Sequence, residues 1–102
     1  MVASPAYDVR LAKAAVRSLR ALEPSDRERI ATALKKEAAR AANPSGSRGG
    51  KTVKQIRGRR DRFYRLRVGG LRVIFDVLND ERTLLVHDVV DRRDLERWLR
   101  SR

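Results

Sequence analysis

The sequence contains no cysteine and a single histidine, His87, among its 102 residues. The absence of cysteine excludes disulfides, thiolate catalysis and cysteine-ligated metal sites. Zinc and iron centres draw on several histidine or cysteine ligands, so one histidine does not predict such a centre. We therefore expect no metal and no other cofactor, and we interpret His87, which alternates with its neighbours in a predicted strand, as a structural or surface residue.

Long apolar runs and a signal-peptide pattern are also absent from the sequence. Their absence predicts a protein of the cytosol with no membrane partner. Charged residues make up 37% of the chain and hydrophobic residues 41%, a balance typical of a globular protein. A chain of this length buries one core, so we expect residues 1–102 to form a single domain.

Acidic residues are scarce, 13 against 25 lysines and arginines, which leaves a net charge of +12. Such a charge predicts nucleic acid or an acidic protein segment as the partner. Arginine supplies 20 of the 25 basic residues, and its guanidinium group binds phosphate in a bidentate manner. The charge is also local, because residues 57–72 hold seven arginines and one acid, Asp61.

The first half of the chain has helical periodicity. Apolar residues recur at helical spacing from Val9 to Leu22, which predicts an amphipathic helix over 8–22. Pro24 suits the first turn of a second helix that runs to about Ala42. The following residues, 43–50, are rich in glycine, serine and asparagine and predict a linker.

The second half has the alternation typical of strands. We predict strands over 62–68, 71–78 and 83–90, and 53–58 is a further candidate. Leu95, Trp98 and Leu99 lie at helical spacing and predict a short C-terminal helix, with Trp98 favoured as a packing residue over a base-stacking one. The order of elements predicts an α+β fold, in which an N-terminal helix hairpin packs on a three- to four-stranded antiparallel sheet and the other face stays open.

The segment 63–77 reads as a β-hairpin about Gly69 and Gly70, which predict a tight primed turn. Pairing about this turn places Arg67 opposite Arg72 and puts both on one face with Arg65. Like charges opposite each other destabilise a strand pair. The arrangement therefore predicts an anionic ligand on this face.

Taken together, several segments of the chain resemble the RelE/ParE superfamily of toxins from type II toxin–antitoxin systems. The resemblance lies in the order and spacing of the segments 7–22, 27–34, 54–58 (Lys-Gln-Ile-Arg-Gly), 64–69 (Tyr-Arg-Leu-Arg-Val-Gly), 71–75 (Leu-Arg-Val-Ile-Phe) and 89–94 (Val-Val-Asp-Arg-Arg-Asp). RelE-like members are ribosome-dependent endoribonucleases, and ParE-like members poison DNA gyrase. The resemblance implies a cognate antitoxin as one partner and, for the favoured RelE-like branch, mRNA on the ribosome as the other.

For an RNA-cleaving toxin, the resemblance implies attack of a ribose 2′-hydroxyl on the adjacent phosphate, stabilised by basic residues. By position, these residues are Arg65, Arg67, Arg72 and Arg92, with Arg93 as the alternative to Arg92. Further basic residues expected to bind RNA are Lys54, Arg57, Arg59, Arg60 and Arg62.

The chain departs from this pattern at the residues that transfer protons. Many relatives have a histidine and a tyrosine where this chain has Asp91 and Glu96. Either Asp91 or Glu96 serves as the base, or the protein cleaves slowly or not at all. Gyrase inhibition, which needs no acid–base pair, and plain nucleic-acid binding are the two alternatives to the RNase interpretation.

Overall fold

The computed structural model describes residues 4–43, 53–57 and 62–101, and it describes side chains for these residues except 53–57 and 62. Its elements in chain order are β1 (Asp8–Leu11), α1 (Lys13–Arg20), α2 (Pro24–Ala42), β2 (Val53–Arg57), β3 (Arg62–Val68), β4 (Leu71–Leu78), the 3-10 helix η1 (Asn79–Glu81), β5 (Thr83–Asp91), the 3-10 helix η2 (Arg92–Asp94) and α3 (Leu95–Arg100). The predicted α+β class is confirmed. Apart from Asn43, the predicted linker 43–50 lies outside the described residues. No helix in the described ranges is long and apolar enough to cross a membrane.

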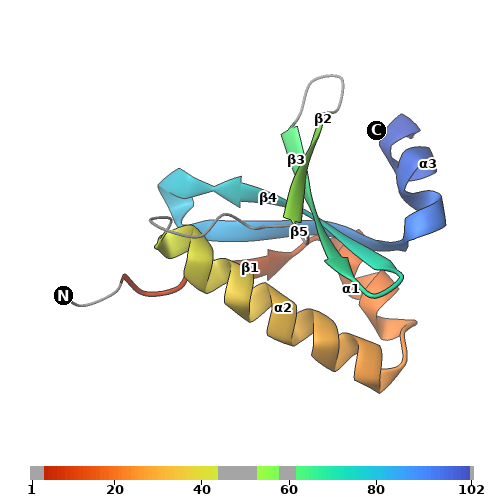
Figure 1. The fold of residues 1–102 in the computed structure, drawn as a ribbon, viewed down its shortest axis with the longest axis horizontal. Helices are drawn as coiled ribbons and strands as arrows, with labels where there is room; N and C mark the ends of the chain where they lie inside the picture. The colour runs from red at the N-terminus through yellow and green to blue at the C-terminus, as the bar shows by residue number, and fades with distance from the viewer. Residues whose placement is uncertain (1–3, 44–52, 58–61, 102) are drawn as a thin grey trace.

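The strands form one five-stranded sheet in the order β1-β5-β4-β3-β2 (Figure 1). The four strands β2 to β5 pair antiparallel, and β2 confirms the fourth strand that the sequence offered. The strand β1 adds a parallel pair with β5 at one edge. In Figure 1, α1 and α2 lie below the sheet, and α3 stands apart from them at the right.

The strand β1 corrects the prediction of a helix over 8–22. Residues 8–11 pair with residues 83–86 of β5, and the helix begins only at Lys13. Backbone hydrogen bonds from Asp8 N to Arg82 O (3.0 Å) and from Ala12 N to Val86 O (2.9 Å) hold the segment at both ends. Val9 fits a helical period with Ala12 and Val16 and a strand period with Leu11, and pairing with a distant strand decided between the two.

The main core lies on the face of the sheet that α1 and α2 cover. Pro24 occupies the first turn of α2, where its fixed φ suits a helix. The inward residues of α2 recur every four positions as Ile30, Leu34 and Ala38, and none is more than 6% exposed. Together with Ala15 of α1, they pack against the strand residues Leu66, Val68, Val73, Phe75, Leu84, Val86 and Val89. The predicted packing of a helix hairpin on one sheet face is confirmed.

The opposite face is not as open as predicted, because α3 covers part of it. Phe63 and Ile74 are buried there with Leu95, and Trp98 and Leu99 pack against them. The ring of Phe63 meets that of Trp98 edge-on, with 5.4 Å between centroids. The prediction of a fully open face is therefore wrong, because two apolar strand residues point to this face and α3 removes them from water.

A β-bulge shapes β5 beneath α3. The register between β4 and β5 shifts between Ile74 and Phe75, which makes His87 the extra residue of β5. The His87 ring packs edge-on against Phe63, with 5.0 Å between centroids, and lies 6.4 Å from the ring of Trp98. These contacts confirm the structural interpretation of His87.

The residue after the bulge, Asp88, ties two helices to the sheet. Its Oδ1 accepts a hydrogen bond of 2.6 Å from Ser18 Oγ of α1. Its Oδ2 accepts one of 3.1 Å from Trp98 Nε1 of α3. One half-buried carboxylate therefore sets the position of α3 relative to the strand face beside it.

Candidate functional site

The β3–β4 hairpin carries three of the predicted site arginines on one face. Arg67 pairs with Arg72 and Arg65 with Ile74, as the sequence predicted. Arg67 is exposed, and Arg65 and Arg72 are half-buried. The like-charged cross-strand pair is therefore present in the folded protein.

The turn of this hairpin requires glycine at one position, Gly69. Of Gly69 and Gly70, only Gly69 has a positive φ, 59°, which is the pattern of a type II′ turn and confirms the predicted primed turn. A Cβ atom at Gly69 would also lie 2.9 Å from Nη2 of Arg29 in α2. Arg29 therefore lies against the turn.

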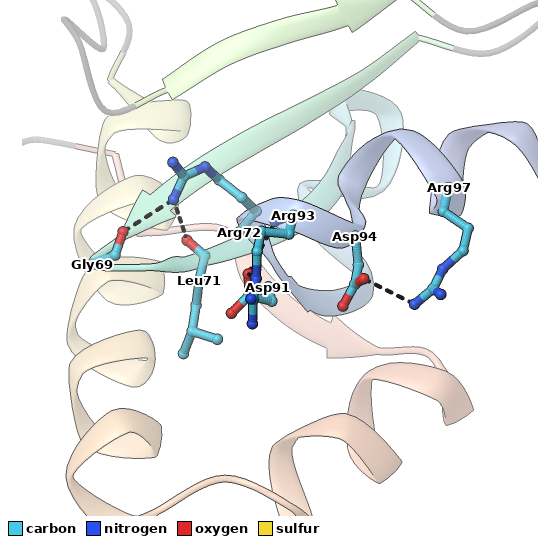
Figure 2. Close-up of polar contacts among 7 residues, drawn as sticks. All are labelled: Gly69, Leu71, Arg72, Asp91, Arg93, Asp94 and Arg97. Carbon is cyan, nitrogen blue, oxygen red and sulfur yellow. Dashed lines mark hydrogen bonds and ion pairs between the residues drawn. The ribbon is translucent and has the colours of Figure 1, made fainter.

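The guanidinium group of Arg72 is fastened to the same turn. Its Nη1 donates hydrogen bonds to Gly69 O (3.0 Å) and Leu71 O (2.9 Å), as Figure 2 shows. Partial burial lowers the pKa of Arg72, and the positive charges of Arg67, Arg65 and Arg92 lower it further. An arginine keeps its proton at neutral pH despite such a shift. The part of the shift that comes from the three arginines is repulsion, which an anion on this face would relieve and which the charge of Asp91 already opposes.

The 3-10 helix η2 begins beside the turn and gives the two predicted arginines, Arg92 and Arg93, different surroundings. The backbone N–H of Arg92 donates to Gly70 O at 3.0 Å. Arg92 is exposed, and its charge acts on Arg72. Arg93 instead places its Nε 3.3 Å from Asp91 Oδ1. The geometry thus favours Arg92 over Arg93 as the fourth arginine of the cluster.

The predicted proton-transfer residues lie at the start of the C-terminal helices. Asp91 caps η2, because its Oδ1 accepts a hydrogen bond of 3.0 Å from Arg93 N. This bond, aided by the Arg93 side chain, lowers the pKa of Asp91. The carboxylate is thus ionised at neutral pH but a weaker base than an ordinary aspartate. Glu96 lies exposed in the first turn of α3.

Three of the remaining basic residues of the prediction lie on β2 or on the neighbouring strand β3. The backbone register places Lys54 opposite Arg65 and Arg57 opposite Arg62. The other two predicted RNA-binding residues, Arg59 and Arg60, lie outside the described residues. Their roles remain predictions.

We name Arg65, Arg67, Arg72 and Arg92 the arginine cluster. Within the described residues, the ion-paired arginines are Arg29, Arg40, Arg93 and Arg97. None of the cluster is ion-paired there. Figure 2 shows the contrast, since Arg72 contacts only carbonyl oxygens among the residues drawn while Arg97 contacts Asp94. Such a cluster can bind a phosphate group and stabilise negative charge that develops on it.

Two residues of this region were missed by the sequence reasoning. Arg29 belongs to a charged helical stripe that reads as solvated surface, and only the tertiary structure brings it to the Gly69 turn. Asp88 alternates within a strand like any surface acid. Its contacts to Ser18 and Trp98 cross 70 and 10 residues of sequence, and no local pattern indicates the first of them.

Comparison with known proteins is informative at the level of family and fold. The model of the family described as ParE toxin of type II toxin-antitoxin system, parDE, matches residues 9–96. No match is found among curated proteins.

Three solved structures of RelE proteins have a similar fold. The toxin–antitoxin complex RelBE2 from Mycobacterium tuberculosis is 20% identical, with a TM-score of 0.67 over 86% of this chain and 100% of that one. The RelE–RelB complex from Pyrococcus horikoshii OT3 is 25% identical, with a TM-score of 0.62 over 86% and 97%. A free RelE mutant from E. coli is 20% identical, with a TM-score of 0.61 over 92% of each chain.

Proposed function

The chain belongs to the ParE toxin family of type II toxin–antitoxin systems, and from this premise we propose that it is a toxin of the RelE-like kind, an endoribonuclease that cleaves mRNA on the ribosome. The observation that carries this proposal is the arginine cluster. Three of its members lie on one hairpin face, where partial burial and, after it, repulsion within the cluster lower the pKa of Arg72. A bound phosphate would turn this repulsion into attraction.

The proposed reaction is an internal transesterification of RNA. The 2′-oxygen of a ribose attacks the adjacent phosphorus, the bond from phosphorus to the 5′-oxygen breaks, and a cyclic phosphate remains. A base takes the 2′-hydroxyl proton, and the departing 5′-oxygen gains one. Arg65, Arg67, Arg72 and Arg92 stabilise the negative charge on the equatorial phosphate oxygens.

Asp91 is the proposed base, and its geometry makes it a weak one. Its carboxylate is ionised and 41% exposed, but it already accepts hydrogen bonds from Arg93. Glu96, exposed and one turn further along, is the second candidate. We propose that the arginine cluster contributes more to catalysis than either carboxylate.

The proposed partner in regulation is a cognate antitoxin. The similar proteins from Mycobacterium tuberculosis and Pyrococcus horikoshii were solved as toxin–antitoxin complexes. A net charge of +12 suits an acidic partner, and electrostatic attraction would make its association rate depend on salt. Association followed by stopped-flow should slow steeply as the ionic strength rises.

Gyrase inhibition is the second candidate function, and a specific observation favours it. The matching family model is that of ParE toxins, and Asp91 and Glu96 replace the histidine and tyrosine of many RNA-cleaving relatives. A gyrase inhibitor needs no such pair. The arginine cluster would then bind an acidic protein surface or DNA.

One paired experiment separates the two candidates. Primer extension on translated mRNA after brief induction should show new 5′ ends, and a gyrase supercoiling assay run beside it should show no inhibition. The opposite pair of results would replace the RNase proposal with the gyrase one.

Variants then test the residues. Arg72→Ala should abolish cleavage, and Asp91→Asn should reduce it by about a hundredfold if Asp91 transfers a proton. Asp94→Asn is the matched control, because Asp94 is a nearby carboxylate bound to Arg97 at 2.9 Å and has no proposed role. Full activity of both Asp91→Asn and Glu96→Gln beside an inactive Arg72→Ala would assign catalysis to the arginines alone.

A further inference from the structure

An open pocket of about 550 Å³ lies at the edge of β5, between α1 and α3. The strand β1 covers this edge only up to the pair of Leu11 with Val86, where its register with β5 ends. Beyond that pair, residues 89–91 of β5 line the pocket themselves, together with Ala21 at the end of α1 and Trp98 of α3. The volume lies within the range of about 300 to 1,000 Å³ that is typical of small-ligand pockets.

The register of the sheet determines where the backbone groups along the pocket point. In a two-residue hairpin, the residues beside the turn bond to each other, so Leu71 directs its backbone groups to β3 and Arg72 directs its own to β5. Arg72 pairs with Val90 of β5. Because neighbouring residues of a strand point their backbone groups in opposite directions, those of Val89 and Asp91 point away from β4, to the edge on which the pocket lies.

Two hydrogen bonds agree with this alternation. Arg92 N, on the β4 side, donates to Gly70 O at 3.0 Å. Val89 N, on the pocket side, donates to the carboxylate of Asp88 at 2.8 Å. Two further groups then face the pocket, the C=O of Val89 and the N–H of Asp91. They are an acceptor and a donor two residues apart on one strand edge.

The polar and apolar groups of the pocket match a nucleobase. The Watson–Crick edge of a base carries an N–H donor beside an acceptor atom, which suits the pair formed by Val89 C=O and Asp91 N–H. Ala21 and Trp98 supply apolar walls, and an aromatic wall favours the flat face of a base. The one basic residue of the described lining is paired with a carboxylate, so the pocket suits an uncharged base better than a phosphate.

We propose that this pocket binds a purine base of the RNA whose phosphate binds the arginine cluster, an inference that rests on the RNA substrate of the proposed function. Asp91 connects the two sites, because it lines the pocket and is followed directly by Arg92 of the cluster. Figure 2 shows Asp91 between Arg72 and Asp94. A purine covers more of the apolar walls than a pyrimidine does. Asp94 and Arg97, which also line the pocket, pair with each other at 2.9 Å and have no part in the proposed contacts.

The backbone of Asp91 permits a matched pair of variants that tests its N–H. Its φ of -67° and ψ of 148° suit proline, and the preceding Val90 lies in a strand, as proline favours. Asp91→Pro removes the N–H and the carboxylate. Asp91→Ala removes the same carboxylate and keeps the N–H. Both variants lose the cap of η2, so the difference between them isolates the contact with the base.

Two exposed alanines provide a second pair that leaves Asp91 intact. Ala21 lines the pocket at the end of α1, and Ala14 lies in α1 outside the described lining. Ala21→Leu narrows the pocket without removing a contact of the core. Ala14→Leu adds the same side chain elsewhere on the surface.

The probes are short fluorescein-labelled 2′-O-methyl oligomers, which lack the 2′-hydroxyl that the proposed reaction uses and are therefore not cleaved. One carries only adenine, one carries only uracil, and one is an abasic backbone. All three have the same charge, so attraction to the arginine cluster is equal among them. Binding is measured by fluorescence anisotropy at about 0.15 M salt. The emission of Trp98, the single tryptophan, is followed with unlabelled oligomers.

The parent should bind the adenine oligomer about tenfold more tightly than the abasic one, with the uracil oligomer between them. The adenine oligomer should change the emission of Trp98, and the abasic one should not. The tenfold advantage should fall below about twofold in Asp91→Pro and Ala21→Leu, and it should persist in Asp91→Ala and Ala14→Leu. The abasic oligomer should bind the two variants of each pair alike.

Three results would overturn the proposal. An equal advantage of adenine in Asp91→Pro and Asp91→Ala would show that the base does not contact the strand edge. A uracil oligomer that binds as tightly as the adenine one would contradict the purine preference. Concentration-dependent dimers of the parent that Asp91→Pro abolishes and Asp91→Ala retains would assign this edge to a second copy of the chain.

The abasic oligomer separates this proposal from the one beneath it. If the parent binds neither the abasic nor the adenine oligomer, the RNA substrate of the proposed function is wrong. If the parent binds the two equally and the emission of Trp98 does not change, only the base pocket is wrong.

Discussion

The two faces of the sheet differ in composition, because one is apolar throughout and the other is partly apolar and partly charged. On the face that α1 and α2 cover, the apolar side chains pack continuously, and Val73, Phe75, Leu84 and Val86 are fully buried. The other face has two parts. One is the apolar patch of Phe63 and Ile74 on which α3 packs, which we call the seat of α3, and the other is the arginine cluster. Alternation along the same strands supplies both faces, because successive side chains point to opposite sides.

This difference separates stability from function. Burial of apolar side chains on the helix-covered face stabilises the fold, and these buried side chains are not available to a ligand. The arginine cluster costs stability through repulsion and offers a charged surface in return. The seat of α3 lies between them, since it is apolar but depends on one polar anchor, Asp88. Substitutions on each part should therefore differ in size and in sign.

The largest effect is expected on the helix-covered face. Phe75 is fully buried in the main core, and Phe75→Ala should lower the free energy of unfolding by about 3 to 5 kcal/mol. Small domains have only about 5 to 15 kcal/mol of total stability, so chemical denaturation should show a clearly lower midpoint for the variant than for the parent. A change below about 1 kcal/mol would mean that the core packs loosely there.

An intermediate effect is expected at the anchor of α3. Asp88→Ala removes the acceptor of the Ser18 and Trp98 hydrogen bonds and should cost about 1 to 3 kcal/mol. Trp98 is the single tryptophan of the chain, so its fluorescence should shift to the red as α3 loosens.

The control for this variant is Asp80→Ala, because Asp80 is an exposed acid in η1. It should change stability by less than about 0.5 kcal/mol. Unchanged tryptophan emission in Asp88→Ala would show that Asp88 does not hold α3.

A small effect of opposite sign is expected in the arginine cluster. Arg67→Ala relieves the repulsion with Arg72, so unfolding should cost about 0.2 to 1 kcal/mol more than in the parent. Growth inhibition should be lost in the same variant, because Arg67 is one of the residues that we propose to bind phosphate. Thermal melts and induction assays measure the two effects separately.

Arg17→Ala, on the exposed side of α1, is the matched control and should leave growth inhibition intact. Clear destabilisation of Arg67→Ala would instead identify Arg67 as a structural residue. Arg72→Ala tests the repulsion less directly, because it also removes the hydrogen bonds that Arg72 donates to Gly69 O and Leu71 O.

The smallest effect is a pH dependence at Asp91. The pKa of this carboxyl is lowered in the folded state, first by the hydrogen bond from Arg93 N. Its ionised form therefore stabilises the fold above the unfolded-state pKa of about 3.9, and this contribution is lost as the pH falls through the folded-state pKa. The melting temperature of the parent should exceed that of Asp91→Asn at neutral pH, and the two should converge in acid. A difference that persists in acid would have another cause than this charge.

Local sequence was sufficient to predict the hairpin at the centre of the site. Gly69 and Gly70 define the turn, and the strand period of two then determines which arginines share a face. The pairing of Arg67 with Arg72 follows from these two facts alone. The second helix could also be predicted from local sequence, because Pro24 and the spacing of the apolar residues indicate where the helix begins and which side is buried.

Contacts between distant segments decided the rest. Residues 8–11 became β1 because β5, more than 70 residues away, offered a free edge. The seat of α3, the Asp88 anchor and the approach of Arg29 to the Gly69 turn also join elements far apart in the chain. Neighbouring residues carry periodicity and turn chemistry, so they specify single elements and hairpins. Which edge a strand joins, and which face a helix covers, depends on the apolar surface and backbone hydrogen bonds that remain free once the other elements have formed.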